Sequence, residues 1–263
     1  PTFAEGWALL GAACADLGSL PASVAAYRSA LRCPDGLFSG DMNPILRHRC
    51  LLNLGHRLIN NHIVNLDRMA EAEDVLWQAL QLGGKLLTEM KLSETDLPKV
   101  KAVQAFAHTN LSLIASLLNN TISEDLHAET GFSMNPDPTT ELGLAFAHLF
   151  QGKYRSGIEH FEARFPYKLG TYEHYPWPRW KGDRVKRLFV DCEQGLGDSL
   201  SFARFIGPAS HLVGELVFSV QPELAGLLSR SFRDVPNINV MPQNHVLGDF
   251  DAWCPVFSLP VPL

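Results

Sequence analysis

The apolar positions follow two different periods along the chain. Up to about residue 165, apolar residues recur at helical spacing, and the alternation of β-branched residues that is typical of strands is absent. From about residue 187 onward, short apolar runs alternate with helical patterns. The sequence therefore predicts a helical first part and an α/β second part.

The first helical segment, "EGWALLGAACADLGSLPASVAAYRSALRCPD", has the residues of a helix pair. Gly11 and Ala30 are small enough to let two helices approach closely, and Gly18 and Pro21 interrupt the chain between them. Similar patterns follow around Leu54 and Gly55, at 71–82, at 102–118 and at 142–165. We expect helix pairs, although the sequence gives no clear second helix after residue 118.

This arrangement resembles the tetratricopeptide repeat, a helix-turn-helix unit of about 34 residues with large and small residues at set positions. The first copy matches well and departs from the pattern at Cys14 and Ser23. The later copies are irregular. The resemblance implies an α-solenoid over residues 1–170, whose concave surface would bind a protein or peptide. The alternative is that these apolar positions only hold the solenoid together.

The second part begins after a connector at residues 171–186, which is rich in proline and tryptophan. Strands are expected at 187–193, 215–220 and 238–241, with helical patterns between them, and Pro222 stands where it would open the second helix. This βαβαβ order predicts a Rossmann-like parallel sheet at residues 187–263. Ligands of such sheets bind at the carboxyl ends of the strands.

The glycine loop in "DCEQGLGDSLSF" (residues 191–202) follows the first of these strands. It is not a dinucleotide fingerprint, because Leu200 stands where the third glycine is needed, and a Walker A sequence is absent. Asp198 lies at the expected helix start, where its carboxylate would repel a phosphate. Two interpretations stay open for Asp198: a helix N-cap, or a functional carboxylate.

The strings "GKYRSGIEHFEARF", "WPRWKGD", "RLFVDCEQGLGDSLSFARF" and "FDAWCPVFSLP" together resemble bacterial proteins in which tetratricopeptide repeats precede a glycosyltransferase-like domain. The EQGLGD segment is similar to a loop of heptosyltransferase-like enzymes of the GT-B fold, and the layout is similar to that of protein O-GlcNAc transferases. The resemblance implies the N-terminal, acceptor-side half of a GT-B enzyme. A nucleotide sugar would be the donor substrate, bound mainly by a second domain beyond this sequence, and no cofactor is expected.

The resemblance also implies roles for residues of the loop. Asp198 would be the general base that takes the proton of an acceptor hydroxyl, on a protein or a glycan. Gly195 and Gly197 would let the backbone approach the sugar. The other candidates for substrate binding are Glu193, Gln194 and Arg204. The alternatives are a Glu193 that binds the turn or is solvated, a Gln194 that only orients or caps the loop, and an Arg204 that is exposed or ion-paired.

Composition narrows the remaining possibilities. The net charge of −6 argues against broad binding to nucleic acid or to anionic membranes. The five cysteines and ten histidines lack ligand spacing, so we expect no metal site and favour a reduced, cytoplasmic compartment. No apolar stretch is long enough for a membrane span. The first residue, Pro1, and the abrupt end suggest a segment of a longer polypeptide.

Three functions compete at this point. The leading one is a repeat scaffold joined to the acceptor half of a glycosyltransferase. Its rival is a non-enzymatic interaction protein with a degenerate glycosyltransferase-like domain. A Rossmann oxidoreductase is disfavoured by Leu200 and by the lack of an acidic ribose ligand at the expected position. Whether the protein is an enzyme depends on residues beyond Leu263.

Overall fold

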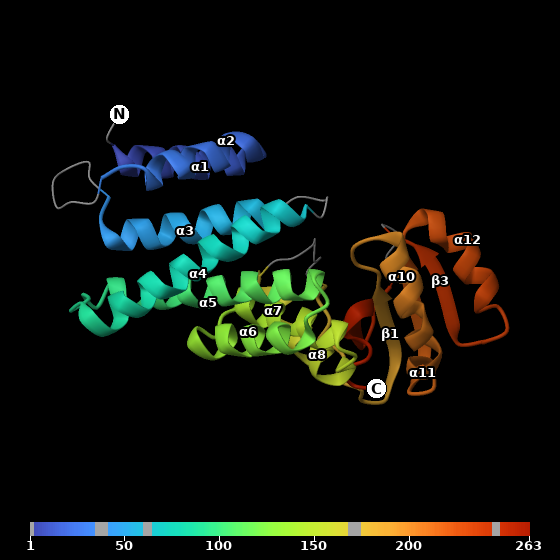
Figure 1. Cartoon of the computed structure of the whole chain (residues 1–263). Helices are drawn as coiled ribbons and strands as arrows, with labels where there is room; N and C mark the ends of the chain where they lie inside the picture. The colour runs from blue at the N-terminus through green and yellow to red at the C-terminus, as the bar shows by residue number, and fades with distance from the viewer. Residues whose placement is uncertain (1–2, 35–41, 60–64, 168–174, 244–247) are drawn as a thin grey trace. The chain divides into compact units, whose positions relative to one another are not determined.

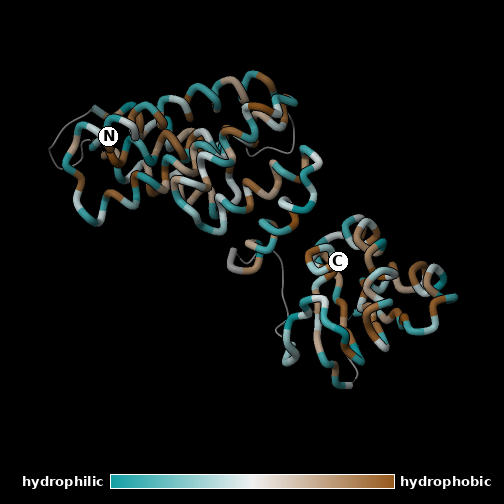
Figure 2. The backbone as a smooth tube through the Cα atoms, turned by 90° about the horizontal axis from the view of Figure 1, so that it is seen from below, coloured by the Kyte–Doolittle hydropathy of each residue, from teal (hydrophilic) through white to brown (hydrophobic). Residues whose placement is uncertain are grey.

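The computed structural model describes residues 3–34, 42–59, 65–167, 175–243 and 248–263. The chain divides into two compact units between Lys153 and Tyr154. We call the first the helical unit and the second the α/β unit. Hydropathy alternates along the helices, as expected for elements with one buried face (Figure 2). Within the described ranges, no helix combines the length and the hydropathy that crossing a bilayer requires.

The described part of the helical unit consists of consecutive helices that pack against their neighbours in the chain (Figure 1). The helices are α1 (Ala4–Asp16), α2 (Leu20–Leu31), α3 (Pro44–Ile59), α4 (Leu66–Glu89), α5 (Asp96–Leu117), α6 (Thr121–Met134) and α7 (Pro138–Phe150). The closest pairs are α1 with α2, α3 with α4, and α5 with α6. The prediction of a helical first part is confirmed.

The pair α1–α2 shows why small residues are needed at its interface. A Cβ atom on Gly11 would lie 2.9 Å from the ring of Tyr27, so only glycine lets the two helices approach this closely. The hydroxyl of Ser23 donates a hydrogen bond of 2.7 Å to the carbonyl of Gly11 across the same interface. Gly18, with φ of +72°, makes the turn between the helices.

Helix α6 is the helix that the sequence pattern did not reveal. It begins after Asn120, whose side chain accepts a hydrogen bond from the backbone N–H of Ser123. Its buried face is small or polar rather than apolar, and consists of Glu124, His127, Ala128 and Gly131. The usual apolar period is therefore absent although the helix is well packed.

The α/β unit contains one parallel sheet with the strand order β3-β2-β1-β4. Its strands are β1 (Val185–Asp191), β2 (Val213–Val220), β3 (Ile238–Pro242) and β4 (Ala252–Pro255). Its helices are α8 (Tyr154–Phe161), α9 (Arg164–Tyr167), α10 (Leu196–Phe202), η1 (Ala203–Phe205), α11 (Ile206–Ser210), α12 (Pro222–Ser231) and η2 (Val256–Ser258). The predicted parallel α/β part is confirmed, and β4 is a strand that the sequence pattern did not assign.

Strand β1 lies in the middle of this sheet and pairs with both β2 and β4. Val190, for example, is opposite Phe218 on one side and Cys254 on the other. The three residues Leu188, Phe189 and Val190 are fully buried, as expected for a central parallel strand covered on both faces. The position of β1 fixes where the loop that follows it must lie.

The helical pattern after the loop forms three short helices instead of one. The sequence predicted a helical pattern between the first two strands, but the structure has α10, the 3₁₀ turn η1 and α11 there. Pro208 accounts for the break, because it lacks an N–H to donate to the carbonyl of Arg204 and its ring crowds that carbonyl. A 3₁₀ turn accommodates the missing bond.

The described part of the predicted connector packs along β4. The backbone N–H of Trp180 donates to the carbonyl of Trp253 (2.8 Å), and the N–H of Trp253 donates to the carbonyl of Pro178 (3.0 Å). Trp177 lies in an aromatic cluster with Tyr175, Phe189 and Phe250. Residues 168–174, which include the start of the connector, lie outside the described residues.

Candidate functional site

The candidate site lies at the carboxyl ends of β1 and β4. The chain reaches β2 and β3 on one side of β1 and then returns to β4 on the other side. Parallel sheets bind ligands at this kind of switch point, in the crevice between the two strand ends. At this edge the glycine loop follows β1 and η2 follows β4.

The backbone of the glycine loop takes its unusual conformation at Gln194. This residue has φ of +63°, which is uncommon for a residue other than glycine. Its carbonyl accepts a hydrogen bond of 3.1 Å from the side chain of Gln221, at the end of β2. Gly195 has φ of −84°, so it does not serve to supply a positive φ. The loop is therefore held in shape by Gln194 and Gln221.

Gly195 and Gly197 instead leave two positions of the exposed loop without a side chain. Both are exposed, and a Cβ on Gly197 would have no atom within 4 Å. A Cβ on Gly195 would meet only the carboxylate of Asp198, at 3.1 Å. The space beside the backbone is open, which is the property that a close approach of a substrate requires.

Asp198 is not the N-cap of the helix, which corrects that interpretation of the sequence. Gly195 is the N-cap, and α10 begins at Leu196, so Asp198 is the third residue of the helix. Its Oδ2 accepts a hydrogen bond of 3.2 Å from the backbone N–H of Gly195. A carboxylate in this position returns to cap the helix start and interacts favourably with its dipole. The side chain stays exposed.

Glu193 points inward and forms a buried ion pair with Arg164. Nε of Arg164 donates to Oε2 of Glu193 at 3.0 Å, and Nη2 donates to Oε1 at 2.8 Å. The side chains are 0% and 5% exposed, respectively. The backbone N–H of Phe257, in η2, donates to the same Oε1 at 3.2 Å. Glu193 thus joins the glycine loop to the turn after β4.

Two further charged side chains and a hydroxyl complete this network. Glu162 accepts from Arg164 (2.7 Å), from Arg179 (2.9 Å) and from the hydroxyl of Ser258 (2.6 Å). The hydroxyl oxygen of Ser258 accepts from both arginines, at 2.7 and 3.0 Å. Two cations and two carboxylates balance each other. Burial alone would lower the pKa of Arg164, but Glu193 and Glu162 outweigh it, so the pKa is raised.

A second polar group lies at the ends of β1 and β3. Oδ2 of Asp191 accepts from the hydroxyl of Tyr175 at 3.0 Å, and Oδ1 accepts from the side chain of Gln243 at 3.2 Å. Gln243 also donates to the carbonyl of Cys192 at 2.7 Å. Burial raises the pKa of the Cys192 thiol to about 12, so it supplies almost no thiolate at neutral pH.

The structure divides the predicted site residues into three groups. Gln194, Gly195, Gly197 and Asp198 lie together on the exposed loop. Glu193 belongs to the buried network. Arg204 is exposed in η1, where its guanidinium donates to the carbonyl of Ser201 at 2.6 Å. Sequence reasoning missed Arg164, the ion-pair partner of Glu193. It also missed the residues that complete the network around Arg164, which are Glu162, Arg179 and Ser258. All of them lie in the strings that carry the glycosyltransferase resemblance, which was their only signal.

No family model matches the chain. It is similar to Protein FlbA of Caulobacter vibrioides, with 30% identity over 149 residues. The match covers 53% of this chain and 24% of that protein. The chain therefore matches about a quarter of the length of its relative.

Proposed function

We propose that this chain joins a tetratricopeptide-type scaffold to the acceptor-side half of a GT-B glycosyltransferase. The observation that carries the proposal is an exposed carboxylate, Asp198, beside two glycines with open space around them, on a loop at the switch point of a parallel sheet. The glycosyltransferase resemblance of the same loop is the second support. The donor half, with the nucleotide sugar, belongs to a domain outside this sequence.

In this proposal Asp198 acts as the general base. Its carboxylate takes the proton of the acceptor hydroxyl while the hydroxyl oxygen attacks the anomeric carbon of the sugar. The bond from that carbon to the diphosphate breaks, and the nucleoside diphosphate leaves with the electron pair. One oxygen of Asp198 holds the N–H of Gly195, so the other is available for the acceptor.

The remaining loop residues position the acceptor. Gly195 and Gly197 give the sugar or the peptide access to the backbone, and Gln194 presents its exposed side chain beside them. Glu193 contributes through Arg164 and Phe257, which fix the inner side of the loop. Arg204, exposed on η1, would contact an anionic part of the substrates. In this proposal Glu193 is a positioning residue.

The helical unit would supply the partner-binding surface. Its helix pairs with interlocked small and large residues, such as Gly11 with Tyr27 and Gly55 with Leu76, support the tetratricopeptide proposal. Helices α4 and α5, with 24 and 22 residues, are longer than the segments that the pattern predicted. We propose a cytoplasmic solenoid that presents a protein or peptide acceptor.

One observation favours the non-enzymatic alternative. The helical unit exposes several large apolar side chains, among them Leu117, Leu118, Ile122, Leu126 and Phe150. Exposed apolar side chains that gather into a patch are typical of protein-binding surfaces. In that alternative the chain only assembles proteins, and the α/β unit has lost its chemistry.

Mass spectrometry of cellular proteins distinguishes these functions. Cells that carry this gene are compared with three alleles: a deletion, Asp198→Asn, and the control Asp234→Asn, which changes an exposed carboxylate outside the loop. The proposal expects proteins that lose a glycan mass in the deletion and in Asp198→Asn, but keep it in the control. Loss in the deletion alone removes Asp198 from the mechanism. No change of mass in the deletion refutes glycosyl transfer and leaves the interaction module.

A further inference from the structure

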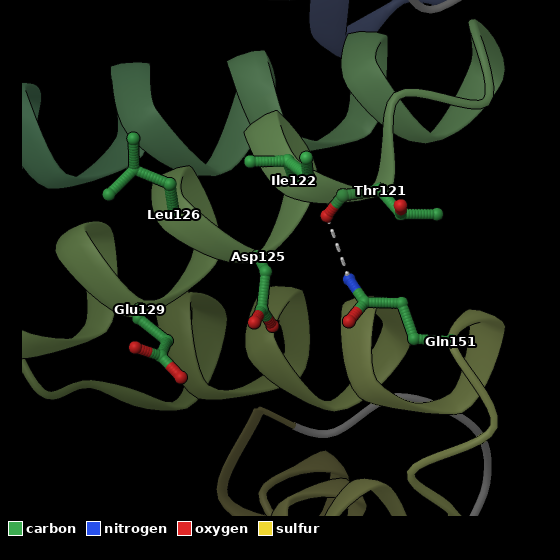
Figure 3. A pocket seen from close by; sticks show the side chains of 6 residues that line it. All are labelled: Thr121, Ile122, Asp125, Leu126, Glu129 and Gln151. Carbon is green, nitrogen blue, oxygen red and sulfur yellow. Dashed lines mark hydrogen bonds between the residues drawn. The ribbon is translucent and has the colours of Figure 1, made fainter.

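Three potential metal ligands meet between α6 and α7 in the helical unit. Asp125 and Glu129 are four residues apart and share one face of α6, and His148 lies in the last turn of α7. One ligand atom from each side chain lies within 4.8 Å of the others. Figure 3 shows the carboxylates of Asp125 and Glu129 extending from α6 in the same direction.

The two carboxylate oxygens of Asp125 have different surroundings. Oδ2 forms an ion pair of 2.7 Å with the ammonium group of Lys153. Oδ1 is buried, has no hydrogen-bond donor among the described residues and lies 3.7 Å from Nε2 of His148. A buried oxygen without a donor is costly, because it has lost its water without replacement. A cation between Oδ1 and the imidazole would satisfy it.

The ligand group opens into a pocket. The pocket has a volume of about 410 Å³ and is lined by Thr121, Ile122, Asp125, Leu126, Glu129 and Gln151 (Figure 3). The side chain of Gln151, which lines the pocket, donates a hydrogen bond to the carbonyl of Thr121 at 3.3 Å. An ion held by the three side chains would therefore keep coordination positions for water or for another ligand.

We propose that Asp125, Glu129 and His148 bind a divalent ion of the zinc class. One imidazole nitrogen and two carboxylate oxygens suit zinc, whereas calcium and magnesium prefer oxygen ligands alone. Zinc bonds of about 2.0–2.2 Å place neighbouring ligand atoms about 3.5 Å apart in a tetrahedron. The 3.7 Å between Asp125 and His148 is close to that value, and Glu129 is exposed and able to move in.

This site is independent of the proposed glycosyltransferase function. The sequence analysis predicted no metal site, because the carboxylates and His148 come from different helices without a short spacing. The bound ion would connect α6 to α7. Zinc binding would therefore raise the free energy of unfolding of the helical unit.

Titration calorimetry of the metal-free chain with Zn²⁺ and, separately, Mg²⁺ tests the proposal. We expect one zinc site and at least tenfold weaker magnesium binding. Glu129→Gln and Asp125→Asn should each weaken zinc binding about tenfold or more, and His148→Gln should do the same. His211→Ala, at an exposed histidine of the α/β unit, should leave the affinity unchanged. Glu129 is exposed, so its variant keeps the fold whatever happens to the buried His148.

Replacing Lys153 should change the zinc affinity in the opposite direction. Lys153→Met removes the cation that shares Asp125, so zinc affinity should rise, by roughly tenfold for unit charges 2.7 Å apart in water. Cobalt substitution identifies the ligands, since the complex should show d–d bands without the intense thiolate charge-transfer band of a cysteine site. Equal affinity for Mg²⁺ and Zn²⁺, zinc binding that survives Glu129→Gln and His148→Gln, or a thiolate band would each overturn the proposal.

Discussion

Replacing Arg164 with methionine perturbs the buried network at its most central residue. Methionine keeps most of the length and the apolar stem of the side chain, but it removes every hydrogen bond to Glu193, Glu162 and Ser258. Among the described residues, the carboxylate of Glu193, 5% exposed, would then keep only the N–H of Phe257 as its partner. The variant therefore leaves a buried charge without its counter-charge.

The expected cost follows from that burial. Removing one partner of a buried ion pair typically destabilises a protein by about 3–5 kcal/mol, because the other charge stays desolvated. The guanidinium of Arg164 also lies 4.3 Å from the ring centre of Phe165, a contact that methionine replaces in part. Glu193→Gln should cost less, about 1–3 kcal/mol, since Arg164 keeps Glu162. The double variant should cost less than the sum.

Urea unfolding of the full chain measures these costs. Trp7 and Trp77 are first replaced by phenylalanine, so that fluorescence comes only from Trp177, Trp180 and Trp253 of the α/β unit. Arg155→Met is the matched control. Its ion pair with Glu159 is exposed, with side-chain exposures of 92% and 56%, so we expect no more than about 0.5 kcal/mol.

Two results would refute this reasoning. If Arg164→Met costs no more than Arg155→Met, the buried network does not stabilise the α/β unit. If the effects of Arg164→Met and Glu193→Gln add without coupling, the two side chains do not interact in solution as the structure shows.

The remaining predictions concern other parts of the molecule. Burial lowers the pKa of His48 from its ordinary value to about 4, so the unfolded chain binds more protons between about pH 6.5 and 4. The resulting stability is complete above that range, and the part due to His48 is lost as the pH falls, by about 3 kcal/mol; urea titrations from pH 7.5 to 4.5 should show this loss, and His48→Leu should reduce the slope without abolishing it, because burial also lowers the pKa of His108 to about 4. Gly11→Ala should destabilise the helical unit by about 1–3 kcal/mol through the clash with Tyr27. Gly84→Ala, whose added Cβ would have no described atom within 4 Å, should instead stabilise α4 by up to about 1 kcal/mol. Thermal melts test both variants, and melting temperatures that shift in the same direction would contradict this reasoning. Asp198→Ala should cost about 0.5–1 kcal/mol through the lost bond to Gly195, and Asp198→Asn less; equal melting temperatures for Ala and the parent would show that this bond does not stabilise α10.

Local patterns sufficed for most of the fold. Small residues and a left-handed glycine mark the pair α1–α2, and the change of period separates the helices from the sheet. The hydrophobic pattern failed to reveal elements whose buried residues are polar or whose length is short. Helix α6 buries Glu124 and His127, so its inner face carries no apolar signal. Strand β4 is only four residues long, which is too short for a clear period.

The candidate site was predictable in position but only partly in orientation. The glycine loop was expected at a strand end, and it lies there. What the loop sequence does not encode is the neighbour of each side chain. Glu193 lies five residues before Asp198, yet it is buried because Arg164, contributed by α9, reaches it. Such contacts between distant segments leave no trace in the spacing of the loop.

Glu193 and Asp198 have different environments, and this difference bears on which of them could act as a general base. A general base must reach a proton on the substrate, and a buried carboxylate whose oxygens are both bound to Arg164 cannot do so without breaking that pair. Asp198 has one hydrogen bond from Gly195 and is exposed, so it needs no such rearrangement. Of the two acids, Asp198 is therefore the better candidate for chemistry. Glu193 has the environment of a residue that holds the loop in place, and this assignment predicts that Arg164→Met impairs the loop without removing a reacting group.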